Sequence, residues 1–455
     1  MQGGGEKGKG ERTRGRGKGK GKGGRRRQSL EPLSPSSSRA RERASAFIPP
    51  LFIAAFSPLL LAASPLHLPA FASCFVFDKS KGGGGGRVRE VVVVVVVKVL
   101  VVVEGAGPAG IATAGCLNKL RISNIVLERD DCPASLWRKR AYNRLKLHLG
   151  KDFCSLPHYP FPSDFPKFVP RVDFLRYIDS YITYFGIAIN YNCSVDSAFI
   201  DQSSKKWRLL VTNNTSGADE IYEAEFLVVA SGENSEEYIP NIQGLESYQG
   251  ESMHCSKYLN GREMYKKNVL VFGCGNSGME IAYDLSNWGA YTSIVVRSQV
   301  HYFIKEMVYA GMLMLKHFMV EKVDKMMVLM SKLKYENMFK YEKIKKGKVK
   351  VYPGISSIKE GKLVKFVDGQ HAYFDAIIFA TGYKTNVLKW LKDYKNLFNE
   401  NGMPKPSYPN HWKGEHGIYS AGFSKRGLEG ISFDAMKIAN DINFILTSRV
   451  NQITS

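Results

Sequence analysis

The sequence predicts an α/β fold built from two similar strand–turn–helix units. The first observation is that a glycine-rich turn follows a short apolar strand twice, at residues 105–110 and again at residues 273–278. The second is that a helical pattern and a further apolar strand follow each turn, which is the order of a β–α–β unit with parallel strands. The chain, at 455 residues, is long enough for both units. We therefore expect two Rossmann-like dinucleotide-binding domains.

The first glycine turn follows a valine-rich run at residues 91–103, of which only the last few residues are needed for a buried parallel strand. Glycines in this pattern allow a tight turn, and the helix that follows presents free N–H groups to a pyrophosphate. The next strand, residues 124–127, ends in an acid, which accepts hydrogen bonds from ribose hydroxyls and repels a 2′-phosphate. This turn suits FAD or NAD, and its candidate binding residues are Gly105, Ala106, Gly107, Pro108, Ala109, Gly110 and Glu128.

The second glycine turn repeats the pattern with the opposite charge at the end of its second strand. Residues 268–272 form the first strand, and residues 292–296 form the second. A guanidinium follows that second strand, where it can pair with the 2′-phosphate of NADP, and a neighbouring hydroxyl can add a hydrogen bond. The candidate residues are Gly273, Cys274, Gly275, Asn276, Ser277, Gly278, Arg297 and Ser298. Arg297 by itself could also be a solvated charge.

Two further glycine turns also follow apolar strands. One is Ser231–Gly232, with Asn234 shortly after it, and the other is Thr381–Gly382. A small residue, a hydroxyl and a glycine let the backbone approach a cofactor closely. Each of these turns by itself could equally be an ordinary loop.

Residues 1–90 form a leader of different composition. Residues 1–43 are rich in Gly, Lys, Arg and Ser and lack the apolar residues that a core needs, which predicts disorder. Prolines interrupt the apolar stretch at residues 47–77, so we expect no clear transmembrane helix there. The leader could be a passive tail, a targeting segment, or a basic arm for nucleic acid or a membrane surface, and nucleic acid is the least favoured partner.

Seven cysteines are spread along the chain without a Cys-x-x-Cys pair, which indicates a reducing compartment. We therefore expect a cytoplasmic protein, with the endoplasmic reticulum membrane surface or a plastid as alternatives if the leader is a targeting segment. The sequence contains no metal-ligand cluster and no nucleophilic triad motif. We expect no metal site.

Several longer motifs resemble those of class B flavin-dependent monooxygenases. Residues 248–258, Tyr-Gln-Gly-Glu-Ser-Met-His-Cys-Ser-Lys-Tyr, are similar to the family fingerprint Phe-x-Gly-x-x-x-His-x-x-x-Tyr/Phe, with tyrosine in the first place. Residues 379–383, Phe-Ala-Thr-Gly-Tyr, resemble the family's second glycine-turn signature. Further matches at residues 127–129, 134–137, 144–148, 276–280, 422–423, 426–428 and 434–436 resemble the plant YUCCA group, which makes auxin. The resemblance covers residues 99–441.

The resemblance implies an FAD-binding domain at residues 91–235 and 366–455, with an NADPH-binding domain at residues 236–365 inserted into it. FAD then lies on the first glycine turn, near Trp137 and His148, with Thr381 at the return to this domain, and NADPH lies on the second turn. NADPH reduces the flavin, O2 adds at flavin C4a to form a (hydro)peroxide, and Asn234 contacts the cofactors as the catalytic residue.

For a YUCCA-like enzyme the expected reaction converts indole-3-pyruvate to indole-3-acetate, a step of auxin biosynthesis. Two alternatives stay open. The same scaffold could oxygenate nitrogen or sulfur in small nucleophiles, or it could be an inactive dinucleotide-binding homologue.

Three departures from the family pattern bear on these alternatives. Glu104 stands before the first glycine where the family has valine, which brings a carboxylate close to a pyrophosphate. After His301, the family's Pro-Arg is Ile304-Lys305. Residues 330–349 are shorter than the corresponding family segment. Loss of that segment could open the pocket or prevent folding.

Overall fold

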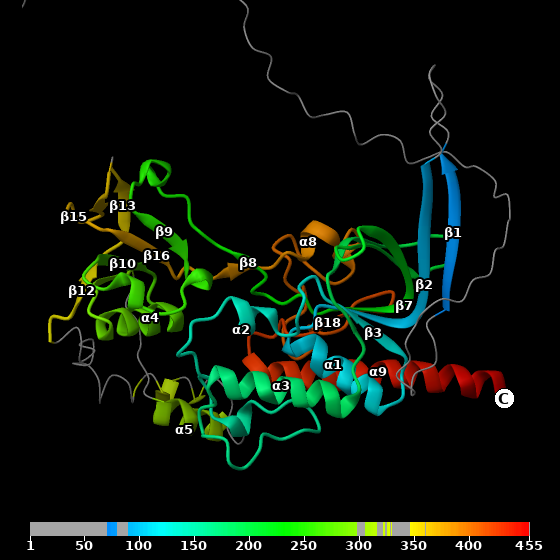
Figure 1. The fold of residues 1–455 in the computed structure, drawn as a ribbon. Coiled ribbons are helices and arrows are strands. Elements are labelled where there is room, and N and C mark those ends of the chain that lie inside the picture. Colours follow the sequence, from blue (N-terminus) through cyan, green and yellow to red (C-terminus); the bar gives the residue numbers. More distant parts are fainter. Residues whose placement is uncertain are drawn as a thin grey trace, which may run out of the picture. The chain divides into compact units, whose positions relative to one another are not determined.

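The computed structural model describes residues 71–79, 90–297, 305–315, 322–323, 325–327, 329, 346–359 and 361–454. Within these residues two large sheets, one mixed and one entirely parallel, dominate the fold (Figure 1). Each sheet contains one of the glycine turns predicted from the sequence. The predicted α/β fold with two Rossmann-like units is therefore confirmed.

The first sheet has the strand order β4-β3-β2-β7-β6-β5, with β1 added to β2 and β18 added to β7. Strands β4, β3, β2 and β7 are parallel to one another, and β18 is parallel to β7. Strands β5, β6 and β7 form an antiparallel meander. Its strands are β1 (Phe71–Lys79), β2 (Glu90–Glu104), β3 (Asn124–Leu127), β4 (Ile189–Asn190), β5 (Cys193–Ile200), β6 (Trp207–Asn213), β7 (Ala218–Val229) and β18 (Ile418–Ser420).

Strand β2 is a central strand of this sheet, and its last valines, Val101 to Val103, are fully buried on both faces. Val101 and Val103 pack into the cluster that also contains the residues of helices α1 (Pro108–Lys119), α3 (Arg171–Phe185) and α9 (Gly427–Thr454). Val102 faces the opposite cluster, under the β5–β7 meander. A strand in which apolar and polar residues alternate would instead leave its polar face in contact with water.

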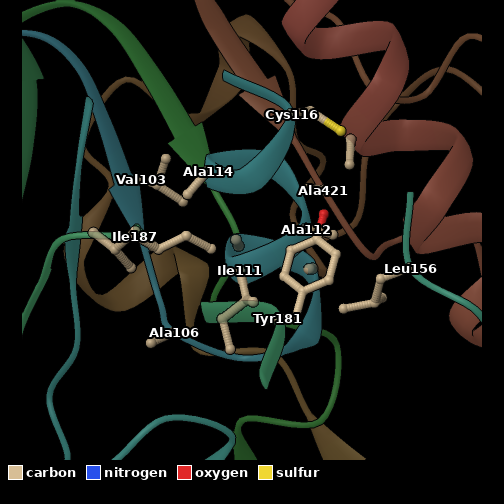
Figure 2. Packing of buried hydrophobic residues seen from close by; sticks show 14 of the residues in the cluster. Val103, Ala106, Ile111, Ala112, Ala114, Cys116, Leu156, Tyr181, Ile187 and Ala421 are labelled. Carbon is tan, nitrogen blue, oxygen red and sulfur yellow. The ribbon is translucent and has the colours of Figure 1, made fainter. Parts of the chain in front are cut away.

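Helix α1 packs closely on α3 because it carries small residues. A Cβ added to Gly115 would lie 2.6 Å from the ring of Tyr181 on α3. Figure 2 shows Tyr181 together with Ala112, Ile111 and the other buried side chains of this cluster. The close packing holds α1, and with it the glycine turn, at the carboxyl end of β2.

Strand β1 lies within the leader predicted at residues 1–90. It runs antiparallel to the first part of β2, with Phe71 opposite Lys98 and Lys79 opposite Glu90. The physical reason is that residues 71–77 are themselves apolar and β-prone, and that the long valine run offers them an edge to pair with. The remaining residues of the leader lie outside the described part of the chain.

The second sheet is entirely parallel and has the order β12-β11-β10-β16-β9. Its strands are β9 (Glu251–His254), β10 (Asn268–Phe272), β11 (Tyr291–Val295), β12 (Val349–Tyr352) and β16 (Ala376–Phe379), and α4 (Asn276–Asn287) connects β10 to β11. The pairing of β16 favours a return to the first sheet after Phe379 rather than after residue 365. The domain boundaries given above stay a prediction.

The smaller elements connect or flank the two sheets. Of the residues described, no helix is both long and apolar enough to cross a membrane. Residues 330–345, which hold most of the shortened segment, lie outside the described residues. The smaller elements are β8 (Glu236–Glu237), β13 (Ile355–Ile358), β14 (Leu363–Phe366), β15 (His371–Tyr373), β17 (Tyr383–Lys384), α2 (Ser135–Lys139), α5 (Lys305–Leu315), α8 (Val387–Trp390) and five single-turn 3₁₀ helices, at Lys151–Phe153, Leu245–Ser247, Cys255–Lys257, Arg262–Met264 and Tyr394–Asn396.

Candidate functional site

The first glycine turn brings β2, β7 and α1 into close contact. Gly105 has a φ of +104°, and a Cβ added there would lie 2.7 Å from the carbonyl oxygen of Ala230, directly after β7. A Cβ on Gly110 would lie 1.8 Å from the carbonyl oxygen of Gly105. Gly107, in contrast, has no atom within 4 Å of an added Cβ. Packing therefore requires the outer glycines, whereas the middle glycine faces open space that a pyrophosphate can fill.

The start of α1 offers backbone donors to that space. Gly107 is the N-cap residue and makes no side-chain capping bond, and the N–H of Ile111 binds the carbonyl oxygen of Gly107 at 3.0 Å. The N–H groups of Ala109 and Gly110 lie in the first helical turn, which has no intrahelical acceptor for them. These donors and the positive end of the helix dipole favour an anion.

Glu128 lies directly after β3 and is 5% exposed. Its Oε2 accepts a hydrogen bond of 2.7 Å from the N–H of Ala106, and its Oε1 accepts one of 2.9 Å from the N–H of Asp130. Burial raises the pKa of Glu128, and the two backbone donors counteract that rise. Each carboxylate oxygen keeps a lone pair for a further donor. The geometry thus favours the predicted role of Glu128 as a ribose acceptor.

A cavity of about 280 Å³ lies over this turn. Its lining comes from the turn itself, the end of β3, helix α2, the loop after β7 and the residues around the start of α9. Of the residues named from the sequence, it brings together Glu104, Gly105, Gly107, Pro108, Ala109, Glu128, Trp137, Ser231, Gly232 and Asn234.

Three cationic side chains in this cavity were not predicted from the sequence. Arg129 follows Glu128 directly, Arg140 follows α2, and Lys425 lies in the loop before α9. Cations suit a ligand with two phosphates. The sequence signal for them was limited to the YUCCA-like matches at residues 127–129, 422–423 and 426–428, because no local motif marks a cation that approaches from another segment.

Of Trp137, His148 and Thr381, which were also predicted for the first site, only Trp137 lines the cavity. Trp137 lines the cavity, with its ring centroid 4.6 Å from that of Phe174 on α3. His148 is exposed and does not line the cavity. Thr381 does not line it either, and its hydroxyl donates a hydrogen bond to the carbonyl oxygen of Tyr238. The proposed contacts of His148 and Thr381 with FAD stay predictions.

The loop before α9 closes the cavity through a third glycine contact. Gly422 has a φ of +84°, and a Cβ there would lie 2.9 Å from the Cβ of Ala109 on α1. Its N–H donates a 2.9 Å hydrogen bond to Oδ2 of Asp434, which is fully buried in α9. Nε2 of the buried His411 lies 3.0 Å from Oδ1 of the same aspartate. This buried pair holds the α9 loop against the first glycine turn.

The second glycine turn reproduces the geometry of the first. Gly273 has a φ of +118°, and a Cβ there would lie 2.4 Å from the carbonyl oxygen of Ala380, directly after β16. A Cβ on Gly278 would lie 2.0 Å from the carbonyl oxygen of Gly273. The middle glycine, Gly275, again has no atom within 4 Å. The Ser231–Gly232 turn therefore follows Ala230, which contacts the first glycine turn. The Thr381–Gly382 turn follows Ala380, which contacts the second.

Arg297 lies just after β11, at the expected end of the second unit. Its side chain is exposed, and its guanidinium carbon lies 5.9 Å from the centre of the Phe272 ring. An exposed cation is free to contact a phosphate, so the NADP interpretation stays a prediction that the position favours. Ser298 lies outside the described residues.

The fingerprint motif at residues 248–258 anchors the Gly382 turn. His254 is 1% exposed, and its Nδ1 accepts a hydrogen bond from the N–H of Ser256 at 3.3 Å. Its other nitrogen, Nε2, lies 3.0 Å from the carbonyl oxygen of Gly382, which assigns the proton to Nε2. Burial lowers the pKa of His254. The neutral imidazole thus ties β9 to the return segment.

The fingerprint ends in a second anchor, on α4. The hydroxyl of Tyr258 donates a 2.7 Å hydrogen bond to Oδ2 of Asp284. The guanidinium of Arg144 contacts the same helix, with its Nε 2.9 Å from Oε2 of Glu280 and its NH1 3.8 Å from Oδ1 of Asp284. Arg144, the first residue of the YUCCA-like motif at residues 144–148, therefore contacts the second unit.

Comparison with known proteins agrees with this geometry. Residues 101–422 match the family described as pyridine nucleotide-disulphide oxidoreductase. The chain is 44% identical over 377 residues to the probable indole-3-pyruvate monooxygenase YUCCA10 of Arabidopsis thaliana. The matched region covers 77% of this chain and 98% of that protein.

Solved structures show the same fold. A flavin-containing monooxygenase from Stenotrophomonas maltophilia has a TM-score of 0.61 at 21% identity, and the match covers 77% of this chain and 99% of that one. A structure named OTEMO, in complex with FAD and NADP, has a TM-score of 0.59 at 15% identity, and the match covers 77% of this chain and 86% of that one. At these identities the likeness concerns the fold alone.

Proposed function

The chain belongs to the pyridine nucleotide-disulphide oxidoreductase family and, within it, to the YUCCA group of monooxygenases, and from this premise we propose that it oxygenates indole-3-pyruvate with NADPH and O2. The observation that carries the proposal is the pair of complete glycine turns, each with an open middle glycine and with opposite charges after their second strands. Two dinucleotides of different ribose chemistry are what such a reaction needs.

The cofactors of this family are FAD and NADPH. We assign FAD to the first turn, because the buried Glu128 accepts hydrogen bonds at its edge and a carboxylate there opposes a 2′-phosphate. The cations Arg129, Arg140 and Lys425 in the same cavity suit the FAD pyrophosphate.

NADPH is assigned to the second turn. Gly275 leaves space for the pyrophosphate, and the exposed Arg297 is free to pair with the 2′-phosphate. No acid follows β11 in the place where Glu128 follows β3. This difference in charge is the basis for assigning the two dinucleotides to different turns.

When bound, the flavin accepts electrons from NADPH and reacts with O2, and the protein supplies position and exclusion of water. Trp137 and Leu136 on α2 form an apolar side of the cavity. Asn234 borders the cavity after the Ser231–Gly232 turn, where its amide can hydrogen-bond to the bound cofactors. The product expected from indole-3-pyruvate is indole-3-acetate.

The test is to purify the full chain, add FAD, and follow the flavin absorbance on addition of NADPH and then of O2. Bleaching by NADPH, return of the absorbance with O2, and formation of indole-3-acetate from indole-3-pyruvate support the proposal. A small amine and a thioether serve as alternative substrates. Oxygenation of either in place of indole-3-pyruvate would favour an N- or S-oxygenase, and a soluble protein that binds no flavin would indicate an inactive homologue.

A further inference from the structure

Helix α5 lies in the chain segment between β11 and β12, which are neighbouring strands of the second sheet. It therefore belongs to the unit assigned to NADPH. The half-buried side chain of Tyr309 on this helix packs on the first unit, against residues between 150 and 167. Neither glycine turn requires such a contact.

Four residues of the first unit surround the ring of Tyr309, and we call them the Tyr309 socket. A Cβ added to Gly150 would lie 2.9 Å from the ring. Nζ of Lys167 lies 3.2 Å from the ring centre, and the ring of Phe153 meets it edge-on at 5.5 Å between centroids. The hydroxyl donates a 3.1 Å hydrogen bond to Oδ2 of Asp152. The socket thus combines apolar, cation–π and hydrogen-bond contacts.

The ring of Tyr309, and not the backbone, requires glycine at position 150. Gly150 has a φ of −64° and a ψ of 148°, which residues with a side chain also adopt. A side chain at this position would displace the ring. The contact with α5 therefore accounts for the glycine.

The Tyr309 socket is connected to the wall of the cavity assigned to FAD. The N–H of Lys151 donates a 2.8 Å hydrogen bond to the carbonyl oxygen of Lys167, which joins the two segments of the socket. Arg171, the first residue of α3, donates a 3.1 Å hydrogen bond from its side chain to the carbonyl oxygen of Trp137. Trp137 lines the cavity. A displacement of α5 would therefore act on a segment that supports the flavin site.

The second unit also holds this segment nearer its start. Tyr142 packs into the core cluster of the second sheet, and Arg144 forms an ion pair with Glu280 on α4. Residues 142–153 are thus fixed to the second unit at two places, once beside α4 and once at α5. One contact alone would leave rotation about that point, whereas two contacts define an orientation.

We propose that Tyr309 is a positioning residue, which through its socket holds the NADPH unit in the orientation that hydride transfer to the flavin needs. The inference rests on the proposed assignment of the two dinucleotides. The step moves one hydride, with two electrons, from NADPH to the oxidised flavin and leaves NADP+ and reduced flavin. The reacting atoms must approach to about 3–3.5 Å, and a misplacement of about 1 Å lowers the rate by about a hundredfold. Tyr309 lies in neither glycine turn, so its loss should leave both nucleotides bound.

The experiment follows anaerobic flavin reduction in the FAD-loaded full chain by stopped flow at several NADPH concentrations. Tyr309→Ala is expected to lower the rate constant at saturating NADPH by about tenfold or more, with NADPH affinity changed by less than about threefold and flavin content unchanged. Tyr309→Phe keeps the ring in the socket and should stay within about threefold of the parent rate. Tyr373→Ala, at a tyrosine that is 68% exposed on β15, is the matched control and should behave as the parent.

A double-mutant cycle separates positioning from a general loss of stability. Gly150→Ala should by itself slow flavin reduction, because its methyl group displaces the ring. Gly150→Ala combined with Tyr309→Ala should be no slower than Tyr309→Ala alone, since no ring is left for the methyl group to meet.

Hydrogen exchange of the flavin-free chain gives a readout that needs no cofactor. The hydrogen-bonded amides of Lys151, Phe153 and Cys154 lie in or beside the socket. They should exchange faster in Tyr309→Ala than in the parent, and Tyr309→Phe should lie between the two.

A folded Tyr309→Ala variant with the parent's reduction rate, or with unchanged hydrogen exchange, would overturn the inference. Additive losses in the double variant would do the same. If Tyr309→Ala does not fold, the reduction rate of Gly150→Ala decides the outcome. A parent protein that binds FAD but is not reduced by NADPH would overturn the proposed function and this inference with it.

Discussion

The six glycines of the two turns have two different physical roles. Gly105 and Gly273 have positive φ values and lie against the carbonyl oxygens of Ala230 and Ala380, so that any side chain there would collide with backbone. Gly107 and Gly275 have no such neighbour, and their missing side chain leaves space for a ligand. Substitution of an outer glycine should therefore affect folding, whereas substitution of a middle glycine should affect binding.

Gly107→Ala is expected to reduce FAD affinity while leaving the protein folded. The added methyl group occupies the space assigned to the pyrophosphate, and loss of one charge-assisted contact costs about 1.5–3 kcal/mol, or about ten- to hundredfold in affinity. Flavin content after purification and an FAD titration measure the effect. Gly275→Ala is the matched control, which should keep the flavin but weaken NADPH. Full flavin occupancy in Gly107→Ala would refute the assignment.

Arg297→Ala is expected to weaken NADPH by about ten- to hundredfold and to leave NADH nearly unchanged. The reason is that only NADPH carries the 2′-phosphate that a guanidinium at this position can bind. Rates of flavin reduction as a function of NADPH and NADH concentration measure the preference. The exposed Arg262, in the 3₁₀ helix before β10, offers a control substitution. An equal loss for both nucleotides would show that another residue reads the phosphate.

Asn234→Ala is expected to leave flavin reduction largely intact but to uncouple it from oxygenation, with hydrogen peroxide released in place of product. One amide hydrogen bond contributes about 0.5–1.5 kcal/mol, which is enough to change the partition several-fold without emptying either nucleotide site. The measurement compares NADPH consumed, peroxide formed and indole-3-acetate produced. Equal coupling in parent and variant would exclude this role for Asn234.

At the scale of single elements, β2 has two parts with different partners. Residues 90–98 pair with β1 along one edge, and residues 101–104 pair with β3. Strand β7 lies beside both parts. Because the glycine turn follows the second part, its position depends on β3, β7 and α1 rather than on β1.

Deletion of residues 1–89 is therefore expected to leave FAD binding intact. The deletion removes β1 but none of the residues that line the cavity. Exposure of the valine edge should make the truncated protein more prone to aggregation, which detergent or low protein concentration would counteract. Flavin absorbance of the soluble fraction is the readout. A soluble but colourless protein would show that β1 supports the turn.

At the scale of the whole molecule, the two units are joined by specific contacts between distant segments. The ring of His254 on β9 contacts the Gly382 turn, and Arg144 contacts α4. Both contacts involve charged or titratable groups. Proton binding to His254 is therefore expected to weaken the connection between β9 and the return segment.

The stability of the folded protein should fall as pH drops below about 6.5. Burial lowers the pKa of His254 from its ordinary value of 6.5, so its contribution to stability is fully present above that value and is lost as pH falls through the lowered pKa. Thermal unfolding between pH 5 and pH 8 measures this dependence. His254→Gln should flatten it, and His371→Gln, at an exposed position, should not. Parallel profiles for all three proteins would contradict the prediction.

The sequence by itself determined the α/β class and the location of both glycine turns. Glycine spacing, strand composition and the residue after the second strand are local properties, and local sterics dictate the same turn wherever it occurs. The acid at position 128 was identified for the same reason. Its buried geometry, with two backbone donors, agrees with the role assigned to it.

Only the tertiary structure decided which distant residues share the first cavity. It brought Arg140 and Lys425 to the turn and left His148 exposed outside it. It also paired β1 with the valine strand and placed Glu104 in the lining of the same cavity as Glu128. These arrangements depend on packing between segments far apart in the chain, and no local pattern of residues encodes which segments meet.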